Sequence, residues 1–123
     1  MPGARVSTGI NDRTGQRYAH FWCPGCDEVH GVIVDKGTEA PEPWGWNRSL
    51  SAPTFTPSVL VTGSRPATDA EIERIRAGEK IEPTPRRCHS FVTNGQIAFL
   101  ADCTHALAGK TVDLPLVTTW RYT

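Results

Sequence analysis

The stretch RCHSFVTNGQIAFLADC, residues 87–103, decides the fold. Asn94-Gly95 stands between two apolar runs and predicts a two-residue hairpin turn, because both turn residues need a positive φ. This turn sets Val92 opposite Ile97 and Cys88 opposite Ala101. Since side chains alternate between the two faces of a sheet, one face carries Cys88, Ser90, Val92, Ile97, Phe99, Ala101 and Cys103. The opposite face carries His89, Phe91, Ala98, Leu100 and Asp102.

The rest of the chain also favours strands over helices. Strand-like patterns occur in residues 5–10, 17–22, 29–34 and 54–61. Pro57 confines the last of these segments to a sheet edge or a bulge, because proline cannot donate to a ladder. One short peripheral helix is expected near residues 68–78, with Thr68 as its N-cap and Gly78 at its end. The sequence predicts a mainly β protein, with a small antiparallel sheet built from hairpins in a single domain over residues 1–123.

Composition limits the classes of function. The 123 residues include 13 basic and 13 acidic side chains, so no net charge marks a nucleic-acid-binding surface. No apolar run approaches the roughly 20 residues of a membrane span, and the N-terminus lacks a signal-peptide pattern. We expect a protein made in the cytoplasm that acts on or with another protein, while its oligomeric state stays open.

The four cysteines indicate a metal site. Cys23 and Cys26 form a tight C-P-G-C knuckle between two expected strands. Cys88 and Cys103 are diagonal neighbours across the hairpin, roughly 7–8 Å apart at most. Thiolates from two separate hairpins suit tetrahedral Zn²⁺, and a reducing cytoplasm keeps them available. We predict that Cys23, Cys26, Cys88 and Cys103 hold one structural Zn²⁺, which stabilises the sheet.

Three alternatives to this ligand set stay open. In the first, His30, His89 or His105 replaces one thiolate as a ligand. In the second, the cysteines are free thiols that pack as small hydrophobic side chains. In the third, the C-x-x-C pair has a redox or disulfide role, although a strand-like segment follows it where a thioredoxin-like site has a helix.

His89, Asp102 and His105 form a second candidate site. His89 and Asp102 are diagonal neighbours on the hairpin face opposite the cysteines, and a carboxylate against an imidazole makes a base. A further histidine would complete an open metal site for hydrolysis. Ser58 and Ser90 are candidate nucleophiles, provided that the fold brings them close. The structural alternative is that Asp102 caps the following turn and His89 only packs.

Several motifs together resemble an uncharacterised family of bacteriophages and prophages that is often labelled ammonia monooxygenase. These motifs are FWCPGC (21–26) with His30, WN (46–47), PTFTPSV (53–59), CHSF (88–91) and DCTHALAG (102–109). The label implies membrane spans, which this sequence lacks. The motifs are more distantly similar to peptidase-like proteins of bacterial ubiquitin-like conjugation operons, whose knuckle is C-x-C and which have serine at the position of Cys88. That similarity implies functional positions at Cys23, Cys26, Ser58 and His89.

Two functions follow as expectations. The first is a phage- or prophage-encoded, zinc-stabilised structural or binding module, such as a virion accessory protein with a phage or host protein as partner. The alternative is a small zinc-dependent hydrolase of peptidase type that uses His89, Asp102 and His105.

Overall fold

The computed structural model describes residues 3–38, 42–64 and 67–120. Its elements are β1 (Ser7–Ile10), β2 (Arg17–Cys23), β3 (Glu28–Asp35), β4 (Gly45–Trp46), β5 (Phe55–Thr56), β6 (Val59–Ser64), α1 (Asp69–Arg76), β7 (Pro85–Thr93), β8 (Gln96–Phe99), β9 (Thr111–Asp113) and a 3₁₀ turn, Val117–Thr119. The strands form three antiparallel sheets, in the orders β1-β2-β3, β4-β5 and β6-β7-β8-β9. The mainly β class predicted from the sequence is therefore confirmed.

The hairpin of β7 and β8 follows the predicted register. Asn94 and Gly95 both have positive φ, and Val92 pairs with Ile97. The paired ladder ends at Ser90 and Phe99, however, so the expected pair of Cys88 with Ala101 is wrong. The chain turns after β8, where the Cys103 N–H donates to the Leu100 carbonyl at 3.2 Å. This turn leaves Ala101 exposed and folds Cys103 back under the sheet.

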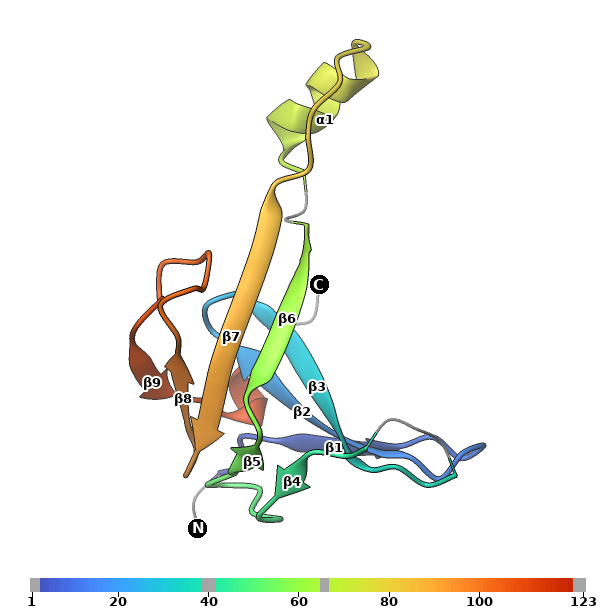
Figure 1. The fold of residues 1–123 in the computed structure, drawn as a ribbon, viewed down its shortest axis with the longest axis vertical. Helices are drawn as coiled ribbons and strands as arrows, with labels where there is room; N and C mark the ends of the chain where they lie inside the picture. Colours follow the sequence, from blue (N-terminus) through green and yellow to red (C-terminus); the bar gives the residue numbers. More distant parts are fainter. Residues whose placement is uncertain (1–2, 39–41, 65–66, 121–123) are drawn as a thin grey trace.

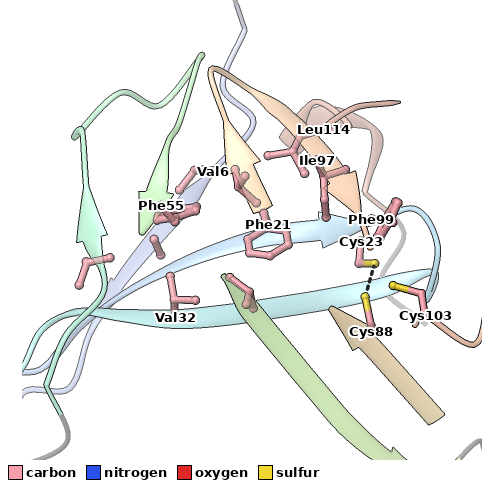
Figure 2. Packing of buried hydrophobic residues seen from close by; sticks show 14 residues of the cluster. Val6, Phe21, Cys23, Val32, Phe55, Cys88, Ile97, Phe99, Cys103 and Leu114 are labelled. Carbon is pink, nitrogen blue, oxygen red and sulfur yellow. Dashed lines mark hydrogen bonds between the residues drawn. The ribbon is translucent and has the colours of Figure 1, made fainter. Parts of the chain in front are cut away.

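A common core lies between the sheets (Figure 2). β2 and β3 contribute Phe21 and Val32, and the hairpin contributes Ile97. The sulfur atoms of Cys23, Cys88 and Cys103 gather at one end of this core, beside Phe99 (Figure 2). Burying such apolar side chains provides most of the free energy that favours folding.

Pro57 separates β5 from β6, and the Thr56-Pro57 peptide bond is cis. β6 then runs along the edge of its sheet, as the proline predicts. At its far end the chain enters α1, which projects away from the sheets (Figure 1). Thr68 caps this helix by accepting from the Glu71 N–H, and no α1 residue is buried. The predicted short peripheral helix is confirmed.

Candidate active site and metal centre

Three thiols and one imidazole meet at the end of the core. Cys23, Cys26, His30 and Cys88 each offer a ligand atom, and these atoms all lie within 4.8 Å of one another. The sulfurs of Cys23 and Cys88 are 3.7 Å apart. Zn–S bonds of about 2.3 Å in a tetrahedron give a sulfur–sulfur edge of about 3.8 Å, so this spacing fits Zn²⁺.

Local structure explains how the four side chains converge. The knuckle after β2 turns tightly, with the Asp27 N–H donating to the Cys23 carbonyl at 2.8 Å. The Cys26 N–H points at the Cys23 sulfur, 3.3 Å away. His30 lies on β3 opposite Phe21, and Cys88 enters from β7 on the core face of the other sheet. The centre thus joins the two largest sheets.

His30 provides the clearest test of metal fit. Its Nε2 atom is buried and has no hydrogen-bond partner. Its Nδ1 atom faces Glu28 Oε1 at 3.9 Å, and Arg86 pairs with the same carboxylate. A carboxylate that accepts a hydrogen bond from Nδ1 is a common way to direct the Nε2 lone pair toward a metal, and Glu28 lies on that side of the ring, although 3.9 Å is longer than a hydrogen bond. The residues present therefore fit a Cys₃His zinc centre.

The pKa values of this group are shifted because its closely spaced side chains share protons. Hydrogen bonds from Cys23 and Cys88 lower the pKa of Cys26 far below its usual range. Hydrogen bonds with Cys23 and Cys26 raise the pKa of Cys88. Burial lowers the pKa of His30, but the nearby sulfurs of Cys23 and Cys26, which favour the protonated ring, outweigh it and raise that pKa to about 9. A bound cation would replace these shared protons.

Cys103 lies outside this four-residue group. Its sulfur belongs to a second cluster, with the sulfur of Cys88 and a ring nitrogen of His105. These three atoms lie within 4.8 Å of one another. The Cys103 sulfur accepts from the His89 N–H and donates to the His89 carbonyl, both at 3.2 Å. The geometry therefore favours His30 in the place expected for Cys103, which is one of the alternatives that the sequence leaves open. The spacing C-x-x-C-x-x-x-H, residues 23–30, is the sequence signal for it.

Ser58, His89 and Asp102 form a hydrogen-bonded series on the opposite face of β7. Ser58 Oγ is 3.0 Å from His89 Nε2, and His89 Nδ1 is 3.3 Å from Asp102 Oδ2. Nucleophile, base and orienting carboxylate follow each other in this way in a serine triad.

Separate elements hold each member of the series. Ser58 stands between Pro57 and β6, and its carbonyl accepts from Trp44 Nε1 at 3.3 Å. His89 lies in the middle of β7, where it pairs with Leu60 of β6. Asp102 lies in the turn that follows β8. A hydrogen bond from the Leu100 N–H to the His89 carbonyl, at 2.9 Å, attaches this turn to β7.

Arg87 supports the carboxylate of this series. Its Nε atom donates to Asp102 Oδ2 at 2.7 Å. This hydrogen bond is the main reason that the pKa of Asp102 lies below its usual value, and the hydrogen bond from His89 adds to the effect. An ionised Asp102 accepts from His89 Nδ1–H, which leaves Nε2 free to accept the Ser58 proton.

The remaining candidates lie elsewhere. His105 does not join His89 and Asp102: its ring packs edge-on against Phe99, with 4.5 Å between ring centroids. Its Nδ1 atom accepts from the Leu107 N–H at 3.2 Å. Ser90 is 1% exposed on the core face, so it is not accessible as a nucleophile. Ser58, which the sequence offers only conditionally, is the serine that the fold brings to His89.

The triad-like series and its position on an accessible sheet face are features of the serine hydrolase class of sites. The chain belongs to the BubE family: the family model described as bacterial ubiquitination-like system serine protease matches residues 3–100. This match supports the similarity to peptidase-like proteins of ubiquitin-like conjugation operons. It does not support a phage origin or the ammonia monooxygenase label.

No significant match was found among curated proteins or among solved structures. Within the described parts of the chain, no helix is both long and apolar enough to cross a membrane.

Proposed function

We propose that the protein is a serine protease in which Ser58 is the nucleophile, His89 the general base and Asp102 the residue that orients it. The observation that carries this proposal is the 3.0 Å approach of Ser58 Oγ to His89 Nε2, with Asp102 behind the ring. The membership of the chain in a family described as serine proteases supports it independently.

The proton transfers and bond changes of the reaction involve these three side chains and water. Ser58 Oγ attacks the scissile carbonyl carbon and forms a C–O bond while its proton passes to His89 Nε2. When the C–N bond breaks, His89 gives that proton to the departing amine. A water molecule then loses a proton to His89 and attacks the ester carbon. When the bond from that carbon to Ser58 Oγ breaks, His89 returns the proton to Oγ, the acid leaves and Ser58 is restored. Asp102 remains ionised throughout.

Zn²⁺ has a structural role in this proposal. Cys23, Cys26, His30 and Cys88 would complete a four-coordinate site, and closed sites of this kind contribute folding free energy. Both ring nitrogens of His89 are already engaged, by Ser58 and Asp102. We therefore favour serine chemistry over a zinc-activated water held by His89, Asp102 and His105. Following the family description, the proposed substrates are ubiquitin-like proteins or their conjugates.

A fluorophosphonate that carries a short alkyl chain tests the nucleophile. The zinc-loaded protein should gain one covalent adduct in intact mass, and peptide mapping should assign the adduct to Ser58. Ser58→Ala should remain folded and unlabelled, since this partly exposed hydroxyl is not part of the core. A folded, zinc-loaded wild type that stays unlabelled, or that is labelled at another residue, would refute the proposal.

A further inference from the structure

Two large apolar side chains lie exposed beside His89, one across the ladder and one further along the same strand. Leu60 of β6 is 49% exposed and pairs directly with His89. Phe91 of β7 is 46% exposed and, two residues beyond His89, lies on the same face of the strand. Exposed apolar side chains that cluster mark binding surfaces more often than isolated ones do. We call Leu60 and Phe91 the apolar patch.

The edge of β6 begins beside the same nucleophile. β6 starts at Val59, one residue after Ser58, and β7 is its only neighbour in the sheet within the described residues. Among the described residues, the backbone of β6 makes no hydrogen bonds to other backbone groups apart from those of its ladder with β7. Leu60 and residues 62–64 of this strand are exposed.

We propose that the substrate binds as an extended peptide along the free edge of β6, with an apolar side chain near the scissile bond resting on the apolar patch. This inference rests on the proposed serine protease function and adds where the substrate backbone binds and which side chain the site prefers. An exposed strand edge offers backbone donors and acceptors to a peptide, while neighbouring side chains select its residues. Because the edge starts at Ser58, a peptide aligned on it brings a carbonyl to Ser58 Oγ. This continuity favours a peptide substrate over a second copy of the chain.

Peptidyl diphenyl phosphonates provide the test, because they phosphonylate an active serine and carry a peptide into its binding site. Tripeptide probes with Leu, Phe or Asp at each position should react with Ser58 at different rates. At one of the three peptide positions, we expect the probes with Leu or Phe to react about tenfold faster than the probe with Asp, as is usual for apolar subsites. Methylating one backbone nitrogen of the best probe should also slow labelling, because it removes a ladder hydrogen bond.

Leu60→Thr and Phe91→Thr should each reduce the preference for Leu or Phe over Asp at least threefold, because each removes apolar contacts with the side chain of the probe. Threonine keeps strand propensity at both positions. Ile10→Thr is the matched control, since Ile10 is 51% exposed on β1 and outside the apolar patch. The small fluorophosphonate should label Ile10→Thr as fast as it labels the wild type. Its rate with each patch variant is measured as well, so that the peptidyl rates can be normalised to it.

The two proposals fail in different ways. A wild type that the small fluorophosphonate does not label at Ser58 refutes the serine protease function. A wild type that it labels normally overturns the substrate inference if no peptidyl probe reacts. Unchanged side-chain preference in both patch variants, or equal rates for N-methylated and unmethylated probes, also overturns it.

Discussion

Cys88 and His89 are consecutive residues of β7 that point to opposite faces of the sheet. Cys88 is 1% exposed, and its sulfur lies 3.7 Å from that of Cys23. His89 Nε2 lies 3.0 Å from Ser58 Oγ on the other face. One strand therefore serves both the metal centre and the triad, so that a metal bound at Cys88 would also fix the backbone of His89.

The identity of the fourth metal ligand can be decided by two variants. We expect His30→Ala to lose zinc and most of its stability, because closed zinc sites contribute about 10 kcal/mol or more to small domains. Cys103→Ser should retain one zinc per chain, since Cys103 lies outside the group and serine preserves its hydrogen bonds to the His89 backbone. Elemental analysis and thermal unfolding measure both effects. Zinc loss in Cys103→Ser with retention in His30→Ala would instead support the thiolate quartet.

Asp102→Asn should slow labelling of Ser58 by about four orders of magnitude, as the equivalent change does in other triads, because the amide favours the wrong tautomer of His89. The fold should persist, since the side chain of Asp102 is 40% exposed. Labelling with the small fluorophosphonate, quenched at a series of times and measured by intact mass, gives the rate. A decrease of less than tenfold would mean that Asp102 does not orient the base.

Asp102 also predicts a pH dependence of stability. Arg87 and His89 hold the pKa of Asp102 below its usual value, so the ionised carboxylate favours the folded state. Its contribution is fully present above the unfolded pKa of about 3.9 and disappears as pH falls through the lower folded pKa. Wild type should therefore exceed Asp102→Asn in free energy of unfolding at pH 6, and the difference should shrink below about pH 4. Urea titrations of both proteins across this range measure it, and metal release in acid affects both alike.

We expect that replacing Ser90, unlike replacing Ser58, leaves the labelling of the protein intact. The Ser90 hydroxyl is buried on the core face without a hydrogen-bond partner, which is unfavourable. Ser90→Ala should thus change the free energy of unfolding by less than about 1 kcal/mol, or increase it. Labelling of Ser58 should continue at the wild-type rate. Loss of labelling in a stable Ser90→Ala protein would assign the nucleophile to Ser90.

Local sequence rules predicted the parts of the fold that depend on neighbouring residues. Asn94-Gly95 fixed the hairpin because few residue pairs tolerate two positive φ angles. Alternation then placed Cys88 and His89 on opposite faces, and the structure has them there. Thr68 marked the start of the helix through its cap.

Contacts between distant elements could not be predicted in this way. The approach of Ser58 to His89 depends on β6 pairing with β7 across the excursion through α1. The selection of His30 over Cys103 depends on how β3 packs against β7, and on the turn after β8 that directs Cys103 to the His89 backbone. Both depend on how strands that are far apart in the sequence pair or pack. The C-x-x-C-x-x-x-H spacing offers His30 as a ligand, but it does not decide between His30 and Cys103.

Glu28 offers a final test of the metal centre that leaves every ligand in place. Its carboxylate lies behind His30 Nδ1 and is itself paired with Arg86. Carboxylates hydrogen-bonded to a ligating histidine orient its ring, and their loss typically weakens metal binding 10- to 100-fold. Glu28 lies 3.9 Å from Nδ1, which is longer than a hydrogen bond, so we expect an effect at the lower end of this range. Glu28→Gln should therefore release zinc to a competing chelator about tenfold more readily than wild type does.

The matched control for this change is Glu42→Gln, because Glu42 forms an exposed ion pair with Lys36 and its side chain is 84% exposed. This variant should bind zinc as wild type does, since exposed ion pairs contribute little. Equal zinc affinity in Glu28→Gln and Glu42→Gln would mean that the His30 ring is held by packing alone. In that case its edge-on contact with Phe21, at 5.8 Å between ring centroids, is the remaining interaction that can fix it.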